Sequence, residues 1–210
     1  ELDVSTWNTS SVTNMNEMFA LLKNISKLDL SNFNTSNVKD MSGMFYACAS
    51  MKELEIGSFN VENVENADYM FSGCSSLNEL NLLSFEFDKL SSARGMFSDC
   101  KNLTTIYGQD WTAMLTIDED NSVNMFKNCY QLVGAVPYNS DKITWEMADT
   151  KGYFTCKHNY IVGETIPPSC TEGGYTEYEC EDCGSAKQEN LTNALGHDYK
   201  AVVTEPTCTE

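Results

Sequence analysis

Residues 38–56 read VKDMSGMFYACASMKELEI and decide the fold, because their pattern returns along much of the chain at a nearly constant interval. The pair Met-Phe occurs at 18–19, 44–45, 70–71, 96–97 and 125–126, so successive copies lie 26, 26, 26 and 29 residues apart. Repeats of this length indicate units that cannot bury their apolar face alone and that stack to share one core.

Other apolar positions keep the same step. They form four rows: Leu2, Leu28, Leu54, Leu80 and Ile106; Val4, Leu30, Ile56 and Leu82; Trp7, Phe33, Phe59, Phe85 and Trp111; and Val12, Val38, Val64 and Leu90. Within a unit, residues 27–31 alternate apolar and polar side chains, which predicts a short strand. The polar residues 32–37 predict a tight bend. The spacing of Val38, Met41, Met44 and Phe45 predicts about two turns of helix.

These patterns predict an α/β solenoid over residues 1–155, with short parallel strands on one face and short helices on the other. About five coils of 26 residues and a closing segment fill this domain. Residues 156–210 have a different pattern and are expected to form a small, β-rich, cysteine-containing module. The first residue, Glu1, stands in mid-pattern, so we expect the chain to be a piece of a longer protein.

The string LDLSNFNTSNVKDMSGMFYACASMKELEI at 28–56 resembles the BspA-like leucine-rich repeat surface proteins of bacteria, in the subgroup whose 26-residue unit carries NTSNVxxMxxMFxxC. The resemblance covers residues 1 to about 155. It implies a leucine-rich repeat superhelix on the cell surface that adheres to host or bacterial ligands. It implies no catalytic residues.

The excess of acidic residues limits the classes of partner that the chain can bind. The 210 residues hold 13 Lys and Arg against 31 Asp and Glu, a formal charge of −18. Nucleic acid is not expected as a partner, because binding phosphates requires clustered positive charge. No apolar run is long enough to span a bilayer. The expected partner is a protein or glycan on a host or bacterial surface.

The side chains that flank the inward residues of each predicted strand point outward and form the candidate ligand-binding face. We name Asp3, Lys27, Asp29, Glu53, Glu55, Glu79, Asn81 and Tyr107. Carboxylates repeated at strand spacing make a negative stripe that attracts basic partners. The alternative is a sheet face that is merely solvated.

Cysteine also follows the repeat, at Cys48, Cys74, Cys100 and Cys129. The matching residue of the first unit is Leu22, which indicates a core position where Cys acts as a small apolar side chain. Side chains in register lie about 4.8 Å apart and point the same way, whereas a disulfide requires facing Cβ atoms about 3.8 Å apart. A row of buried thiols is therefore expected.

The tail begins a second repeat. HNYIVGETIPPSC at 158–170 is echoed by HDYKAVVTEPTC at 197–208, and similar modules occur in the tails of Gram-positive surface proteins. One copy is too small to be stabilised by an apolar core alone. Cys170, Cys180 and Cys183 with His197, or with His158, suit a tetrahedral zinc site. Outside the cell, Cys156 and these three cysteines would instead suit disulfides, with three possible pairings. Free thiols are the third alternative.

The function predicted from these features is a non-catalytic, extracellular binding or adhesion module of a bacterial cell-surface protein. No cofactor is required, apart from the structural zinc considered for the tail. The competing hypothesis is a spacer without a ligand of its own. An enzyme has little support, because the two histidines lie in the tail and no acid-base motif is recognisable.

Overall fold

The computed structural model describes residues 2–112, 117–181 and 184–197. Contacts between residues divide the chain into two compact units, Glu1–Lys157 and His158–Glu210. The first unit contains the Met-Phe repeats, and the second contains most of the cysteine-bearing tail.

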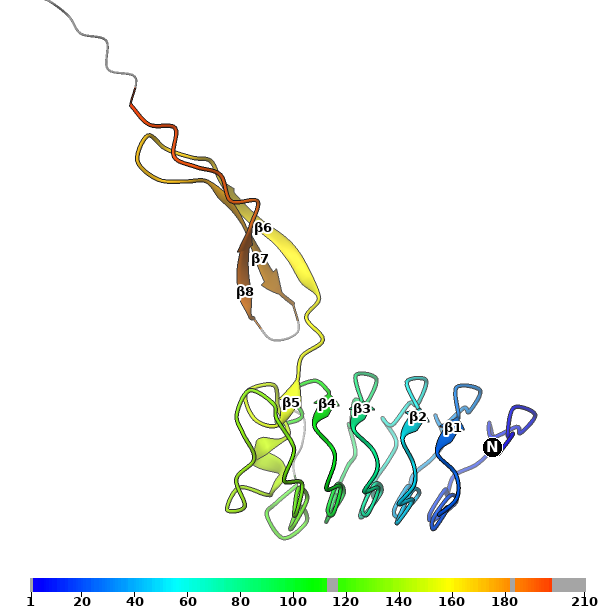
Figure 1. Ribbon diagram of the computed structural model, residues 1–210. Helices are drawn as coiled ribbons and strands as arrows, with labels where there is room; N and C mark the ends of the chain where they lie inside the picture. The colour runs from blue at the N-terminus through cyan, green and yellow to red at the C-terminus, as the bar shows by residue number, and fades with distance from the viewer. Residues whose placement is uncertain (1, 113–116, 182–183, 198–210) are drawn as a thin grey trace, which may run out of the picture. The chain divides into compact units, whose positions relative to one another are not determined.

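The first unit is a row of repeats joined by short parallel strands (Figure 1). The strands are β1 (Lys27–Asp29), β2 (Glu53–Glu55), β3 (Glu79–Asn81) and β4 (Thr105–Tyr107). β1 pairs with β2, which places Leu28 opposite Leu54, and β3 pairs with β4, which places Leu80 opposite Ile106. Residues one repeat apart are therefore neighbours in space.

The core of the first unit consists of apolar rows that run across the repeats. The phenylalanine of each Met-Phe pair stacks on the next, with ring centroids 5.9, 5.6, 5.6 and 5.3 Å apart along Phe19, Phe45, Phe71, Phe97 and Phe126. These five rings are at most 3% exposed. The row stays unbroken across the longer step before Phe126, because the Phe97 and Phe126 rings stack with centroids 5.3 Å apart.

The predicted α/β leucine-rich repeat solenoid is wrong. Among the described residues there is no α-helix, and the single helical element is the 3-10 turn η1 (Trp145–Met147). The strands also fail to form one continuous face: β1 and β2 make one sheet, β3, β4 and β5 (Phe154–Thr155) make a second, and the tail holds a third. The Met-Phe segments are a succession of tight turns.

Backbone hydrogen bonding explains the absence of helix. The Phe45 N–H donates to the Met70 carbonyl of the next repeat, and the N–H groups of Gly43 and Ala47 also donate to the next repeat. An α-helix would use these donors within its own turn. Gly43 and Ala47 have φ of 62° and 54°, which right-handed helix excludes. The intervening donors close turns three residues long, so the apolar spacing resembles that of a helix.

The last part of the first unit closes the row of repeats. β5 pairs in parallel with β4, which places Phe154 opposite Ile106. The Phe154 ring packs edge-on against Trp111, with centroids 4.7 Å apart. The Tyr153 hydroxyl donates to the carbonyls of Asn139 and Lys142 and so ties down the loop before η1. The final repeat thus gains an apolar cover.

The second unit is a three-stranded antiparallel sheet in the order β6 (Tyr160–Ile166), β7 (Tyr175–Cys180) and β8 (Ala186–Glu189). Tyr160 lies opposite Cys180, and Ile166 lies opposite Tyr175. Of its described apolar side chains, only Cys180 is buried, while Val162 and Leu191 are 66% and 74% exposed. Apolar burial therefore contributes little to the stability of this unit.

Candidate functional site

The eight residues predicted to bind a ligand lie on or beside the short parallel strands of the first unit. Asp3, Lys27, Asp29, Glu53, Glu55, Glu79 and Asn81 are exposed, and Tyr107 is half-buried. The structure brings Lys27 opposite Glu53, Asp29 opposite Glu55, and Asn81 opposite Tyr107. Three of the eight residues, Asp3, Lys27 and Asp29, line a surface hollow of about 490 Å³.

Charges on this face are partly satisfied by neighbouring groups. Lys27 Nζ lies 2.8 Å from Glu53 Oε2, a contact that lowers the pKa of Glu53 and raises that of Lys27. The Asp29 carboxylate accepts a hydrogen bond from the Ser31 N–H, which lowers the pKa of Asp29. The negative stripe is thus partly neutralised where the β1 and β2 side chains pair.

A second hollow, which the sequence patterns did not indicate, lies over the Met-Phe turns. It measures about 520 Å³ and is lined by Asn16, Glu17, Ser42, Gly43, Tyr46, Asn66, Asp68 and Tyr69. Tyr46 and Tyr69 are 43% and 46% exposed. None of the lining residues is basic. We call this feature the tyrosine hollow.

Register explains why the tyrosine hollow forms. Glu17, Gly43, Tyr69 and Gly95 occupy equivalent positions in successive repeats, all with positive φ. Gly43 has no side chain, so it leaves a gap between Glu17 and Tyr69. A Cβ at Gly43 would stand 3.0 Å from the Glu17 side chain. The available sequence signal was the glycine at position 43, but it fell in the segment 38–45, which was predicted to be helical.

Two polar side chains around the tyrosine hollow, those of Asp68 and Asn16, are held in place by hydrogen bonds. The Asp68 carboxylate accepts from the Ser92 hydroxyl at 2.6 Å and from the Arg94 N–H at 2.7 Å. The Asn16 side-chain amide donates to the Ser42 carbonyl at 2.8 Å. Two tyrosine rings, two carboxylates and several amides are suited to a ligand with hydroxyl or cationic groups.

The repeat cysteines form the expected buried row. Cys48, Cys74, Cys100 and Cys129 are fully buried. Each thiol donates to a main-chain carbonyl of the preceding repeat, from Cys48 to Phe19 at 3.0 Å through Cys129 to Phe97 at 3.0 Å. Burial raises the pKa of Cys100 well above its ordinary value and that of Cys129 from 9.0 to about 12. These thiols are structural.

The thiol row predicts a loss of stability at high pH. Because folding raises the pKa of Cys129 from 9.0 to about 12, the stabilisation is complete below pH 9.0 and is lost as the pH rises toward about 12. Burial raises the pKa of Tyr138 and Tyr153 too, so they act in the same direction. Urea unfolding between pH 8 and 12 should show this decline. The Cys129→Ala variant should show a shallower one, and equal slopes for the two proteins would refute the thiol contribution.

Two of the predicted zinc ligands that the structure describes, Cys170 and Cys180, lie far apart. Cys170 is exposed in the loop that joins β6 to β7, and Cys180 ends β7 at the opposite end of this hairpin. The strand length from Tyr175 to Cys180 alone corresponds to about 17 Å. The Gly196 N–H donates to the Cys170 carbonyl, which places His197 near the loop. Cys183 lies outside the described residues.

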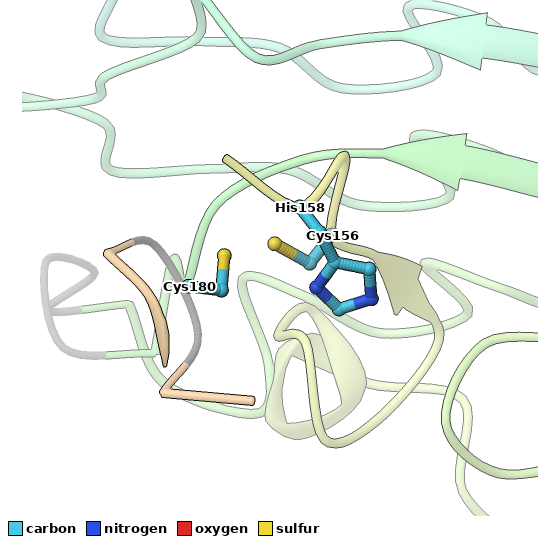
Figure 2. A group of neighbouring side chains, drawn as sticks. All are labelled: Cys156, His158 and Cys180. Atoms are coloured by element: carbon cyan, nitrogen blue, oxygen red, sulfur yellow. The ribbon is translucent and has the colours of Figure 1, made fainter. Parts of the chain in front are cut away.

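A different cluster joins Cys180 to the chain that enters β6. The ligand atoms of Cys156, His158 and Cys180 all lie within 4.8 Å of one another (Figure 2). Cys156 and His158 stand four and two residues before Tyr160, at the period that puts side chains on one face of an extended chain. Tyr160 pairs with Cys180, which places Cys180 beside the start of β6.

The Met-Phe repeats match a known protein family. The family described as "Mycoplasma protein of unknown function, DUF285" matches residues 1–111 and, in an overlapping alignment, residues 28–139. These matches cover more than half of the 210 residues. The chain belongs to this family. DUF285 is a bacterial family associated with surface proteins, which agrees with the coarser part of the resemblance noted in the sequence.

Membership of DUF285 accounts for the Met-Phe repeats and leaves the tail uncovered, since the matches end at residue 139. Neither the curated proteins nor the solved structures contain a match to the chain. Within the described residues, the structure holds no helix suited to crossing a membrane.

Proposed function

We propose that this DUF285 chain is a non-catalytic binding module of a BspA-like bacterial surface protein. It acts outside the cell and recognises a protein or glycan of a host or bacterial surface. The observation that carries the proposal is the tyrosine hollow, in which two exposed aromatic rings and two carboxylates converge over three neighbouring repeats.

The tyrosine hollow suits recognition better than the strand face does. On the strand face, Lys27 and Glu53 already satisfy each other, and the one aromatic residue, Tyr107, is half-buried. Exposed tyrosines supply large contact area at small entropic cost and are enriched at binding sites. A volume of about 520 Å³ falls within the usual range for ligand sites. The proposal therefore moves the ligand from the strands to the turns.

A binding screen with matched variants tests this proposal. The purified chain would be screened against a glycan array and a panel of extracellular-matrix proteins. For any ligand found, Tyr46→Ala and Tyr69→Ala should each weaken binding at least about tenfold, as expected for aromatic side chains at the centre of an interface. Gly43→Asn should also abolish binding, because asparagine tolerates positive φ and fills the gap.

Two controls separate the hollow from its surroundings. Tyr130→Ala removes a tyrosine that is 58% exposed elsewhere in the first unit and should leave binding unchanged. Asp29→Lys changes the strand face and should likewise have no effect. If Asp29→Lys weakens binding while the tyrosine variants do not, the ligand binds the strands and the assignment to the hollow is refuted.

The competing function is a spacer that has no ligand. It is favoured by the pairing of outward charges between repeats, since Lys27 pairs with Glu53 and Lys39 with Glu65 and these groups need no partner from another molecule. A spacer predicts that the screen finds no ligand.

A further inference from the structure

The second unit needs a stabilising element other than an apolar core. Its described buried side chains are Cys180 and Thr176, while Val162, Leu191 and Leu195 are exposed. Units of about 50 residues with so little apolar burial are usually held by disulfides or metal ions. The cluster at the start of β6 supplies the donor atoms for a metal.

We propose that Cys156, His158 and Cys180 bind a structural Zn²⁺ ion at the open end of the β6–β7 hairpin. Tetrahedral zinc with Zn–S bonds of about 2.3 Å and Zn–N bonds of about 2.0 Å requires donor atoms a little under 4 Å apart. The three donors already lie within 4.8 Å of one another, so small side-chain rotations bring them to these separations. A water molecule would take the fourth position on the exposed His158 side. Thiolate and imidazole donors select zinc over magnesium or calcium.

The cluster is supported by the surrounding sheet. The His158 ring stacks on the Tyr160 ring, with centroids 5.2 Å apart and planes 23° apart, which fixes the imidazole. Lys187 of β8 places its ammonium 4.3 Å from the centroid of the same Tyr160 ring. The stacking restricts the orientation of the His158 ring before any metal binds.

Cys180 is held in place by hydrogen bonds to the residues that lead into β8. The Cys180 N–H donates to the Ser185 carbonyl at 2.8 Å, and the Gly184 N–H donates to the Cys180 carbonyl at 2.9 Å. Gly184 has φ of 67°, which a glycine adopts without strain. Cys180 is 1% exposed and Cys156 is 8% exposed, so a bound ion would be shielded from water on the cysteine side.

A zinc site here would differ from the one expected on cysteine spacing alone. That expectation used Cys170 and His197, which lie near the far end of the hairpin. The present proposal uses Cys156 and His158, which precede β6. Both sets share Cys180, and His158 was the alternative histidine of the earlier one, so variants of Cys156, Cys170 and His197 discriminate between them.

Metal loading of the full 210-residue chain tests the proposal. The reduced protein, with zinc added and excess removed, should carry one zinc per chain by native mass spectrometry. Cys156→Ser, His158→Ala and Cys180→Ser should each lower zinc affinity at least about 100-fold, since even supporting residues cost 10- to 100-fold. Cys170→Ser and His197→Ala are the matched controls and should retain wild-type affinity.

Two further measurements distinguish loss of a ligand from loss of folding. His158→Cys keeps a zinc-binding side chain at the same place and should retain one zinc. Cobalt substituted for zinc should show thiolate-to-metal charge-transfer absorption that falls in Cys156→Ser and is unchanged in Cys170→Ser. Chelation should speed amide hydrogen exchange in β6 and β7 but leave the Met-Phe repeats unaffected.

Three outcomes would overturn the proposal. The first is a reduced chain that binds no zinc. The second is a chain whose zinc is lost in Cys170→Ser or His197→Ala but kept in Cys156→Ser and His158→Ala. The third is protein purified without reductant in which peptide mapping finds Cys156 and Cys180 joined by a disulfide and no bound metal.

Discussion

Replacing Phe71 by alanine should lower the free energy of unfolding of the first unit by about 3–5 kcal/mol. The Phe71 ring is fully buried and stacks at 5.6 Å on both Phe45 and Phe97, so the substitution opens a cavity and removes two ring contacts. Typical total stabilities are about 5–15 kcal/mol, so a large part of the margin would disappear. Urea unfolding followed by tryptophan fluorescence would measure it.

Two comparison variants show whether the effect comes from the stacked row. Phe71→Leu refills most of the volume and should recover at least half of the loss. Tyr130→Ala removes a ring that is 58% exposed and should change stability by less than about 1 kcal/mol. A Phe71→Ala protein as stable as the Tyr130→Ala protein would show that the stacked row does not hold the repeats together.

Replacing Thr35 by valine should cost about 2–3 kcal/mol, although the side chain keeps its shape. The Thr35 hydroxyl donates to the Asn60 carbonyl and accepts from the Asn60 N–H, both at 2.8 Å. Valine leaves both main-chain groups of Asn60 without these partners, at about 1–3 kcal/mol for each group that water does not reach. Thermal and urea unfolding would measure the change.

The chain itself shows that valine fits at this position. Thr9, Thr35 and Val61 are equivalent in three successive repeats, and Val61 is 1% exposed. A loss in Thr35→Val therefore reports hydrogen bonds and not volume. Thr35→Ser keeps the hydroxyl and should lose less, and Thr13→Val, at an exposed threonine, should be nearly neutral. A neutral Thr35→Val would mean that water replaces the hydroxyl at no cost.

The helices predicted from the Met-Phe segments show where sequence patterns are ambiguous. Val38, Met41, Met44 and Phe45 are all buried, so their assignment to the core was right. The same spacing arises from tight turns of three residues, in which alternate N–H groups are available to the next repeat. The spacing of apolar residues indicates which side chains face inward. It does not indicate whether the main-chain N–H groups bond within their own segment or to a neighbouring one.

The candidate sites were harder to foresee than the core, because each combines residues from separate repeats or strands. The tyrosine hollow forms because Gly43 has no side chain. Gly43 lies between Glu17 of the preceding repeat and Tyr69 of the following repeat. The cysteine and histidine cluster depends on the β6–β7 register, which pairs Tyr160 with Cys180. Spacing along the chain grouped Cys180 with Cys170 and Cys183, and with either His197 or His158. It contains no information on which end of a hairpin a residue occupies.

The sequence by itself determined the neighbours within the first unit: residues one repeat apart pair, as Leu28 does with Leu54, and the Met-Phe rings stack in order. A regular repeat imposes this, because each apolar position must meet its own copy to be buried. Only the tertiary structure decided the main-chain conformation of the turns, the hollow beside Tyr46 and Tyr69, and the meeting of Cys156, His158 and Cys180. These depend on hydrogen bonds and strand registers between distant segments, which side-chain periodicity does not encode.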